Sequence, residues 1–515
     1  MSALPAQEYE VFAGARLEYA AMEKFVSSRE ASQMTAAELE REIQQRGREL
    51  MRQLYQAHVE LRGPGEAAGP VQGADGVERP KARMHERGLQ TVFGEVRVER
   101  LGYGAKGAES LHPLDAELNL PVELYSHEVR RQAALETAKS SYDDVVELLG
   151  TVTSAGPAKR QTEEMAIRAA QDFDAFYQQQ RSQDQPAEET GAILVITADG
   201  KGVPMRREDL RKATRKRAEQ STPKMESRRS RGEKPHKKRM ATVAGVYTIA
   251  PYERAPEDVV RCMAPRNEKE RPDRPLPENK RVWASLQKKP GEVIAEAFRE
   301  AKKRDPQGGK QWVALVDGNE PQIKILTQCF HDKGRDAVIV LDFIHVAERV
   351  WKAGLDLYAE SSKELEIWVT ERLLEILRGR CSHVAAGMRR SATIRGLNQQ
   401  ARKRIDSCAG YLLNYKNYMH YDEYLDHGFP IATGVIEGAC RYLVKDRMER
   451  TGARWRLKGA EAVLRLRALR KCGDFDSYWA FHEKQEYQRN HAACYGDGIV
   501  VPIKGRQRLR LIRIK

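Results

Sequence analysis

The chain has 515 residues, which is too long for one compact core, so we expect two to four domains. Its 88 Lys and Arg exceed its 74 Asp and Glu, and the net charge of +14 favours a polyanionic partner, with nucleic acid ahead of a membrane surface. No apolar run approaches the roughly 18 residues of a bilayer span, and no signal-peptide pattern is visible. Seven cysteines without a Cys-x-x-Cys pair indicate a reducing, cytoplasmic setting.

Residues 1–80 are expected to form an N-terminal helical region followed by a linker. A helix is predicted over about 35–62, because Thr35 and Glu38 form a capping-box pattern and apolar residues then recur at helical spacing. The Pro/Gly/Ala-rich stretch 63–76 is typical of a linker.

Residues 81–185 are predicted to form a separate region, for which DNA binding is one interpretation. A strand is predicted over 91–100, and helices are predicted over 126–149 and 157–181 with a Gly-containing break between them. A helix-turn-helix for DNA and an ordinary helical hairpin fit these helices about equally well.

A buried strand that leads to one carboxylate opens the next region. Residues 192–196 are apolar and mostly β-branched, and Asp199 and two glycines follow. Taken alone, the pattern favours a strand that ends in an Asp-Gly turn. It indicates a metal site only if other segments supply further carboxylates.

A basic segment over 206–239 comes next and is predicted to be a mobile loop that contacts phosphates, because almost no large apolar residue occurs in it. Strands are then predicted over 241–249 and 281–286. The strand-Asp pattern recurs at Asp317 and Asp342, with a helix between 291 and 303. Strands that first follow one another and then alternate with helices indicate an α/β fold with a mixed five-stranded sheet.

The expected domain boundaries place the first part of a catalytic domain at 190–346. An α-helical insertion is predicted over 347–430, and the final helices of the catalytic domain, with Glu437, over 431–475. Residues 476–515 are expected to form a basic C-terminal tail.

Three carboxylates in separate segments, Asp199, Asp317 and Glu437, suit phosphodiester cleavage. Mg²⁺ prefers oxygen ligands, and two ions about 3.5–4 Å apart can clamp the attacking and leaving oxygens. We therefore expect these residues to bind two Mg²⁺ ions, for which Mn²⁺ can substitute.

Four motifs in order resemble those of bacterial insertion-sequence transposases. They are Asp199-Gly-Lys-Gly, Val316-Asp317-Gly-Asn, Leu341-Asp342-Phe-Ile-His345, and Gly434-Val-Ile-Glu437-Gly with Gly452-Ala-Arg-Trp455. The similarity is to the ISKra type, related to Mutator-like DDE enzymes, and covers roughly residues 85–475. It implies an RNase H-like catalytic domain, the triad Asp199, Asp317 and Glu437, terminal inverted repeats and target DNA as substrates, and a homodimer in the synaptic complex.

The second carboxylate has two candidates. In an RNase H-like sheet the fourth strand flanks the first, and counting strands from Ile193 makes the strand before Asp317 the fourth, which favours Asp317. Asp342 with His345 resembles a signature that supports or orients the site in related transposases. A hydrogen-bonded histidine at a strand end is the simpler interpretation of that pair.

The predicted DNA contacts surround the triad. Basic residues near Glu437 are either a solvated face or phosphate contacts, and an aromatic ring beyond them stacks on an unpaired base or packs in the core. The set is Lys201, Arg441, Lys445, Arg447, Arg450, Arg454 and Trp455. Related transposases often carry a zinc element near Tyr103, but no cysteine precedes Cys262.

Three functions remain open at this point. The sequence favours a Mg²⁺-dependent DNA transposase over a nuclease of the same fold that acts on RNA or DNA junctions. A catalytically inactive, domesticated DNA-binding protein is the third possibility, and the intact carboxylates count against it.

Overall fold

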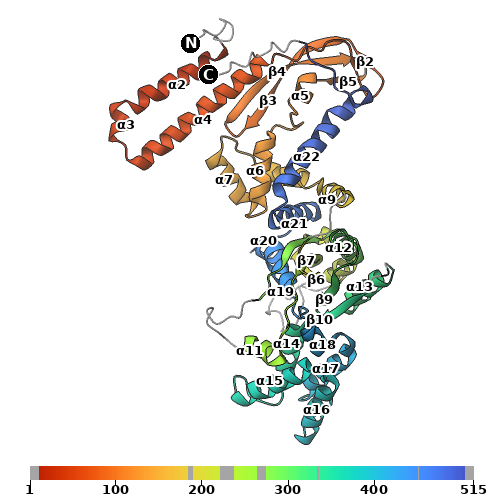
Figure 1. Cartoon of the computed structure of the whole chain (residues 1–515). Helices are drawn as coiled ribbons and strands as arrows, with labels where there is room; N and C mark the ends of the chain where they lie inside the picture. The colour runs from red at the N-terminus through yellow and green to blue at the C-terminus, as the bar shows by residue number, and fades with distance from the viewer. Residues whose placement is uncertain are drawn as a thin grey trace. The chain divides into compact units, whose positions relative to one another are not determined.

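The computed structural model of the chain describes residues 11–183, 189–220, 237–263, 274–332, 334, 336–450 and 452–504. The chain divides into two compact units (Figure 1), and each is treated by itself below. Unit 1 comprises Met1–Phe176 with Gly473–Lys515, and unit 2 comprises Tyr177–Cys472. Within the described parts, no helix has the length and apolar character needed to cross a membrane.

Unit 1 begins with a helical hairpin, which we call the arm (residues 11–62). It consists of α2 (Ala13–Val26), α3 (Arg29–Gln33) and α4 (Ala36–Leu61). The predicted capping box is confirmed: Thr35 N–H donates to Glu38 at 2.8 Å, and Glu38 N–H donates to the Thr35 hydroxyl at 3.4 Å. The expectation of a helical N-terminal region is therefore correct, although the sequence pattern did not reveal α2.

A three-stranded antiparallel sheet follows the arm. Its strands are β3 (Lys81–Thr91), β4 (Gly94–Ala105) and β5 (Ala108–Leu111), and a two-stranded ribbon of β1 (Val71–Gln72) and β2 (Glu78–Arg79) precedes them. The strand predicted over 91–100 is shifted, because a tight turn at Val92 and Phe93 joins two strands there. Leu89, Val96 and Val98 pack with Val59 of α4 in the core.

Five further helices follow the sheet along the chain. They are α5 (Pro113–Glu117), α6 (His127–Thr137), α7 (Tyr142–Val152), α8 (Lys159–Ala169) and α9 (Phe173–Ser182). Two or more helices are expected over 126–149 and 157–181, and four, α6 to α9, form there. Residues expected to form a basic tail are instead partly helical: α22 (Phe475–Asn490) packs in unit 1, where Glu486 pairs with Arg130 at 2.8 Å. Short 3₁₀ turns at Ala492–Cys494 and Gly496–Gly498 follow it.

Unit 2 is built on a five-stranded mixed sheet, as predicted. The strands are β6 (Ile193–Pro204), β7 (Lys238–Ile249), β8 (Glu278–Ser285), β9 (Gln311–Val316) and β10 (Ala337–Leu341), in the order β10-β9-β6-β7-β8. The β6–β7 and β7–β8 pairs are antiparallel, and the β6–β9 and β9–β10 pairs are parallel. Residues 193–198 of β6 are all buried, as the apolar run predicted.

Helices pack against this sheet from several parts of the chain (Figure 1). Helix α12 (Pro290–Arg304) contacts β6 and β7, α21 (Leu457–Cys472) contacts β8, and α13 (Glu320–Asp332) connects β9 to β10. Helix α19 (Gly434–Ala439) contacts β6, β7 and β8. It continues as a π-helix (Cys440–Lys445) and then α20 (Asp446–Met448).

Two expectations near the first strand are corrected. Asp199 does not end a strand, because β6 continues through the glycines to Pro204, paired with β7. The basic segment 206–239 is partly ordered: a 3₁₀ turn (Arg207–Asp209) and α10 (Lys212–Gln220) lie in it, and its last residues belong to β7. The remainder, 221–236, lies outside the described residues.

The segment predicted as a helical insertion is helical. It contains α14 (Phe343–Gly354), α15 (Lys363–Leu377), α16 (Cys381–Ile394), α17 (Lys403–Asn414), a 3₁₀ turn (Lys416–Tyr418) and α18 (Tyr421–Asp426). The short helix α11 (Pro256–Met263) contacts α15. Tyr421 ties the insertion to the sheet, because its buried hydroxyl donates to the Leu341 carbonyl at the end of β10 at 2.8 Å.

Candidate active site

Two aspartates lie level with each other on neighbouring parallel strands of unit 2. The β6–β9 register pairs Thr197 with Leu315, and Asp199 and Asp317 each follow two residues later. Residues two apart along a strand point to the same face of a sheet. Asp199 lies opposite Val243 of β7, and Asp317 directly follows the end of β9. The strand pairing therefore sets the two carboxylates side by side.

The electrostatics of Asp317 agree with this placement. Burial raises the pKa of Asp317, and the negative charge of Asp199 raises it further. A hydrogen bond from the Asn319 N–H to Asp317 Oδ1, at 2.9 Å, opposes this shift and orients the carboxylate. A carboxylate whose ionised form is disfavoured by a neighbouring negative charge is stabilised in that form by a bound cation.

The backbone after Asp317 is held by the helical insertion. Gly318 adopts φ 88°, a conformation that favours glycine. A Cβ at this position would lie 2.8 Å from the Tyr411 hydroxyl, and the Tyr415 hydroxyl donates to the Gly318 carbonyl at 2.9 Å. Helix α17 and the residue after it thus fix the turn that carries Asp317, a support that local sequence patterns did not reveal.

A third carboxylate, Glu437, comes from α19. This helix contacts β6 and β7, and the Glu437 side chain is 49% exposed. Its pKa is raised by burial first and then by the negative charges of Asp342 and Asp199, among others. Glu437 therefore lies within the electrostatic field of Asp342 and Asp199.

Asp342 is also level with Asp317, one strand further along the sheet. The β9–β10 register pairs Val316 with Leu341, and the two aspartates come next in each segment. Asp342 is completely buried, however, and its Oδ1 accepts a hydrogen bond from the Ile344 N–H at 2.7 Å as the N-cap of α14. Its carboxylate is therefore occupied as a helix cap.

The second Asp342 oxygen holds His345. Asp342 Oδ2 accepts from the Thr433 hydroxyl and lies 3.0 Å from His345 Nδ1. The hydrogen bond to Asp342 is the main cause that raises the pKa of His345 to about 9, so the imidazole is a cation at neutral pH. Its Nδ1 also lies 3.9 Å from Glu437 Oε1.

Asp342, His345 and Glu437 are close enough to surround one ion, with ligand atoms within 4.8 Å of one another. The Asp342 carboxylate is already engaged by the Ile344 N–H and the Thr433 hydroxyl, and the hydrogen bond to Asp342 occupies the Nδ1 atom of His345. We therefore assign this group to positioning: Asp342 holds the His345 cation, which neutralises part of the charge near Glu437. Asp199, Asp317 and Glu437 offer the oxygen ligands that Mg²⁺ prefers, but these three carboxylates do not form such a group among the described residues.

Cys440 is a further residue at the site that sequence reasoning missed. Its thiol donates to Asp199 Oδ2 at 3.1 Å, and burial first and then the charge of Asp199 raise the pKa of the thiol above its usual range. Cys440 lies three residues after Glu437, which is a spacing that shares a helix face. It begins a π-helical segment, a rare conformation that frequently occurs at functional sites.

The predicted DNA contacts fall into two groups. Arg441 has a side chain that is 80% exposed, Lys201 is half-buried, and the remaining exposed members are Lys445, Arg450 and Arg454. Arg447 and Trp455 are buried, at 3% and 7% exposure, and the Arg447 guanidinium lies 4.8 Å from the Trp455 ring centroid. The Trp455 indole donates to the Met448 carbonyl at 3.0 Å, so packing replaces the expected contact with DNA for these two residues.

Comparison with known proteins supplies no further information on the site. No family profile and no curated protein matches the chain.

Proposed function

We propose that the chain is a DDE-type DNA transposase that cleaves phosphodiester bonds at the ends of an insertion sequence and joins them to target DNA. The observation that carries the proposal is the level placement of Asp199 and Asp317 on neighbouring strands, with Glu437 of α19 in the electrostatic field of Asp199. The chain's net charge of +14 supports a nucleic acid partner.

The sheet supports an RNase H-like catalytic domain. Numbered from β6, the strand order across the sheet is 5-4-1-2-3, with the second strand antiparallel to its neighbours and the fourth and fifth parallel to the first. This is the arrangement that the resemblance to insertion-sequence transposases implies, in which the second catalytic Asp is expected after the fourth strand. We further propose action on terminal inverted repeats in the bacterial cytoplasm, at the nucleoid, with two copies in the synaptic complex.

Each residue has a defined part in this proposal. Asp199, Asp317 and Glu437 would hold two Mg²⁺ ions, or Mn²⁺ in their place, which when bound would supply Lewis-acid chemistry for phosphodiester displacement. His345, held by Asp342, offsets part of the negative charge around Glu437. Arg441, Lys445, Arg450 and Arg454 contact phosphates and hold the DNA near the carboxylates.

A strand-transfer assay tests the proposal. Labelled DNA that carries the inverted repeats flanking the coding region is incubated with the full chain, target plasmid and Mg²⁺ or Mn²⁺. We expect joined products with the unchanged protein and none with Asp199→Asn or Glu437→Gln. Joining that persists in both variants would contradict the proposed site.

The same carboxylates also suit a nuclease, which is the alternative that the site geometry favours next. A nuclease would cut the labelled ends, RNA or a branched DNA junction with the same metal dependence, and would give no joined product. Binding of the ends without cleavage under any metal condition would instead indicate an inactive, domesticated DNA-binding protein.

A further inference from the structure

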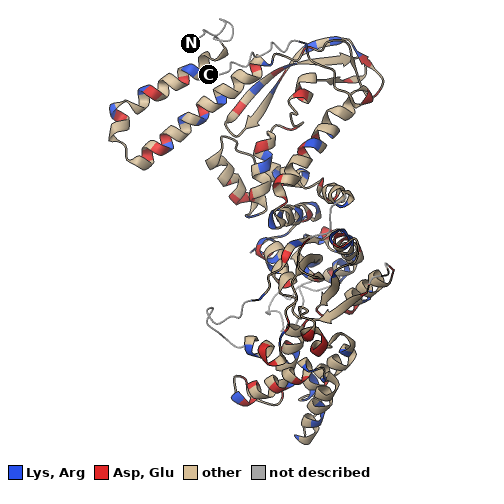
Figure 2. Ribbon diagram, in the orientation of Figure 1, with Lys and Arg blue, Asp and Glu red and all other residues tan. Residues whose placement is uncertain are grey.

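The hairpin of α16 and α17 in unit 2 ends in a strongly basic segment, which we call the tip (residues 389–404). The stretch 376–405 around it contains eight Lys and Arg and no Asp or Glu, although the whole chain has 74 acidic residues. Figure 2 shows Lys and Arg, and no acidic side chain, on α16. A surface that carries one sign of charge attracts a polyanion.

The backbone of the tip is held by its own hydrogen bonds. Gly396, at φ 64°, ends α16: its N–H donates to the Thr393 carbonyl at 3.0 Å, and the following N–H donates to the Ala392 carbonyl at 3.1 Å. This pair of bonds is a common glycine-terminated helix end. The Asn398 side chain then accepts a hydrogen bond from the Ala401 N–H at 2.9 Å, just before α17 begins. The tip therefore has a defined shape without a ligand.

Two arginines of the tip are engaged within the protein. Arg395 donates to the Tyr358 hydroxyl at 2.7 Å, and its guanidinium lies 4.5 Å from the centroid of that ring. Arg402 is paired with Asp406 on the next turn of α17, at 2.9 Å. These two side chains tie the tip to the rest of the helical insertion.

The other four cations of the tip are exposed, and they are Arg389, Arg390, Lys403 and Arg404. Arg390 and Lys403 have no carboxylate within ion-pair distance among the described residues. Arg389 and Arg404 have carboxylates at 3.8 and 3.5 Å. Exposed pairs of that length contribute little to stability. A phosphate can therefore reach all four cations without breaking a strong ion pair.

An exposed apolar side chain lies beside these cations. Ile394, the last residue of α16, is 74% exposed. It follows Arg390 by four residues, so the two side chains share one face of the helix. His383 and Gly387 continue this exposed face, and a Cβ on Gly387 would meet nothing within 4 Å. Proteins that bind the minor groove of DNA use apolar side chains such as isoleucine between base steps, together with basic residues.

The composition of the tip favours duplex DNA over single strands. Its polar residues include Asn398, Gln399 and Gln400, and it contains no aromatic residue. Single-stranded DNA and RNA are usually bound by stacking of their bases on aromatic side chains. Backbone phosphates need only cations, and amide side chains can bond to base edges. The tip therefore has the groups that bind a duplex and lacks those that stack on unpaired bases.

The α7–α8 pair, where the sequence pattern fits a helix-turn-helix, lacks such a surface. Lys159 of α8 is paired with Asp143 of α7 at 2.6 Å, and Arg160 is paired with Glu164 at 3.0 Å. Glu147 of α7 is exposed as well. Carboxylates beside the cations repel phosphates, so this pair of helices suits DNA less well than the tip.

We propose that the tip of the α16–α17 hairpin binds duplex DNA, with its four exposed cations on backbone phosphates and Ile394 against base pairs in the groove. The assignment rests on DNA being the partner in the proposed function. It gives the helical insertion a role in holding that DNA, in addition to the basic residues near Glu437. Binding can be measured without cleavage, so the two proposals can fail separately.

The test measures binding of the full chain to a labelled duplex by fluorescence anisotropy over a range of salt concentrations, with EDTA present to prevent cleavage. The variant Arg390→Gln/Lys403→Gln should weaken binding about tenfold or more. It should also reduce the slope of log affinity against log salt by about two, because two phosphate contacts are lost. Ile394→Ser should weaken binding with an unchanged slope. All three side chains are exposed, so urea unfolding curves should not change.

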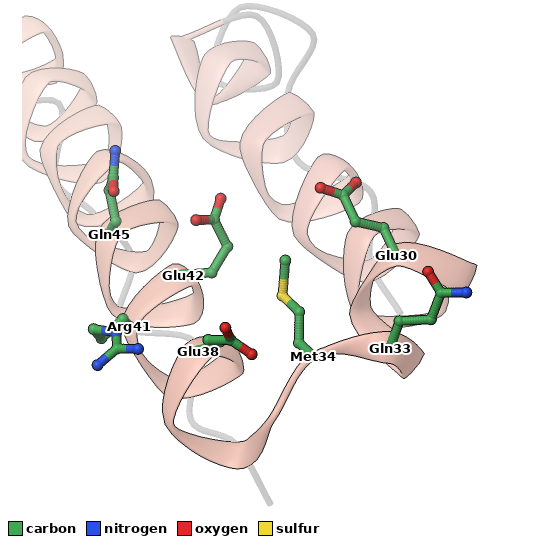
Figure 3. A pocket seen from close by; sticks show the side chains of 7 residues that line it. All are labelled: Glu30, Gln33, Met34, Glu38, Arg41, Glu42 and Gln45. Carbon is green, nitrogen blue, oxygen red and sulfur yellow. The ribbon is translucent and has the colours of Figure 1, made fainter.

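The arm of unit 1 offers a control in the opposite surroundings. A cavity of about 490 Å³ lies between α3 and the start of α4 (Figure 3). Three glutamates and Arg41 line it, so a phosphate is repelled there. The control Arg41→Gln/Lys24→Gln removes one exposed Arg and one exposed Lys of the arm, as the tip variant does in the hairpin. It should change the salt slope much less than the tip variant.

The outcomes distinguish the tip from the catalytic site. Equal salt slopes in the tip variant and the arm control would overturn the proposed tip contact and leave the proposed function standing, and an unchanged affinity in Ile394→Ser would overturn the groove contact. Binding that the tip variant loses only for RNA or single-stranded DNA would overturn duplex DNA as the partner. An unchanged protein that binds no duplex at all would overturn both proposals. Strand transfer is scored in a separate assay.

Discussion

Asp342 Oδ2 lies 3.0 Å from His345 Nδ1, and this hydrogen-bonded pair gives Asp342 a different role from Asp317. Both aspartates follow parallel strands at equivalent positions. Asp342 is completely buried and caps α14, whereas Asp317 is half-buried beside Asp199. A metal ligand needs an accessible oxygen, so the environment favours Asp317 as the second catalytic carboxylate.

Removal of each aspartate should therefore have a different consequence. Asp317→Asn should lower strand transfer roughly a thousandfold or more, because a metal ligand is lost, with little change in the free energy of unfolding. Asp342→Asn should destabilise the protein by about 1–3 kcal/mol, because a buried cap and the partner of a cationic imidazole are weakened. Initial rates of strand transfer and urea unfolding curves measure the two effects.

Asp332→Asn is the control for these variants, since this exposed residue ends α13 away from the carboxylates. It should change neither the rate of strand transfer nor the free energy of unfolding. If Asp342→Asn abolished activity without any loss of stability while Asp317→Asn remained active, the roles assigned to the two residues would be reversed.

Gly318→Ala should disturb the site through the backbone. Alanine disfavours the φ of 88°, and its Cβ would lie 2.8 Å from the Tyr411 hydroxyl. We expect a loss of about 1–3 kcal/mol in unfolding free energy together with reduced activity, because the turn carries Asp317. Adding Tyr411→Phe removes the close hydroxyl oxygen and should restore part of the lost stability. The recovery should be only partial, because the unfavourable φ at position 318 remains.

Gly410→Ala provides the comparison for that substitution. Gly410 lies within α17, and a Cβ there meets nothing within 4 Å. Alanine should stabilise the helix by up to about 1 kcal/mol. Equal destabilisation by the two Gly→Ala variants in urea titrations would show that the turn at Gly318 has no special requirement.

Substitutions of Arg441 and Trp455 should distinguish a residue that contacts DNA from one that packs in the protein core. Arg441→Ala removes an exposed charge and should reduce the slope of log affinity against log salt by about one, with unchanged stability. Trp455→Ala should cost about 3–5 kcal/mol of stability, because a buried ring is lost, and should leave the salt slope unchanged. Fluorescence anisotropy at several salt concentrations and urea unfolding distinguish the two.

The sequence predicted the sheet better than the positions of the site residues within it. Apolar runs revealed the strands around Val195 and Ala314 because both faces of these strands are buried. The pattern placed Asp199 at a strand end, since glycines usually break strands, but β7 pairs with β6 through Gly202. Long-range pairing of this kind leaves no local signal.

The sequence also did not predict the environment of individual side chains. Arg447 and Arg441 occur in the same basic helix, yet one is buried and the other is 80% exposed. The link between Cys440 and Asp199 spans 241 positions and depends on how α19 meets the sheet. Tertiary packing determines such contacts. Sequence spacing alone therefore identifies these residues as candidates, but it cannot show which of them are buried and which are exposed.

The pairing of Arg130 with Glu486 should make unit 1 sensitive to acid. Arg130 is 1% exposed, and its Nη1 donates to Glu486 Oε2 at 2.8 Å. The pKa of Glu486 is lowered from 4.5 to about 2: burial opposes the shift, and the Arg130 charge and its hydrogen bond outweigh it. Because the folded-state pKa lies below the unfolded value, the carboxylate contributes its full stability above about pH 4.5. That contribution is lost as the pH falls toward 2.

Glu486→Gln tests this coupling, since it leaves the buried guanidinium without its main counter-charge. We expect a loss of about 3–5 kcal/mol in the free energy of unfolding of unit 1 at pH 7, and a smaller dependence of stability on pH between 4.5 and 2 than in the unchanged protein. Asp476→Asn on the same helix is the control, because this residue is 82% exposed and its pair with Arg131 should contribute under about 1 kcal/mol. Urea unfolding, followed by near-ultraviolet circular dichroism across this pH range, measures the free energy of unfolding of both variants. Equal losses of this free energy for the two variants would mean that burial does not strengthen the pair of Arg130 with Glu486.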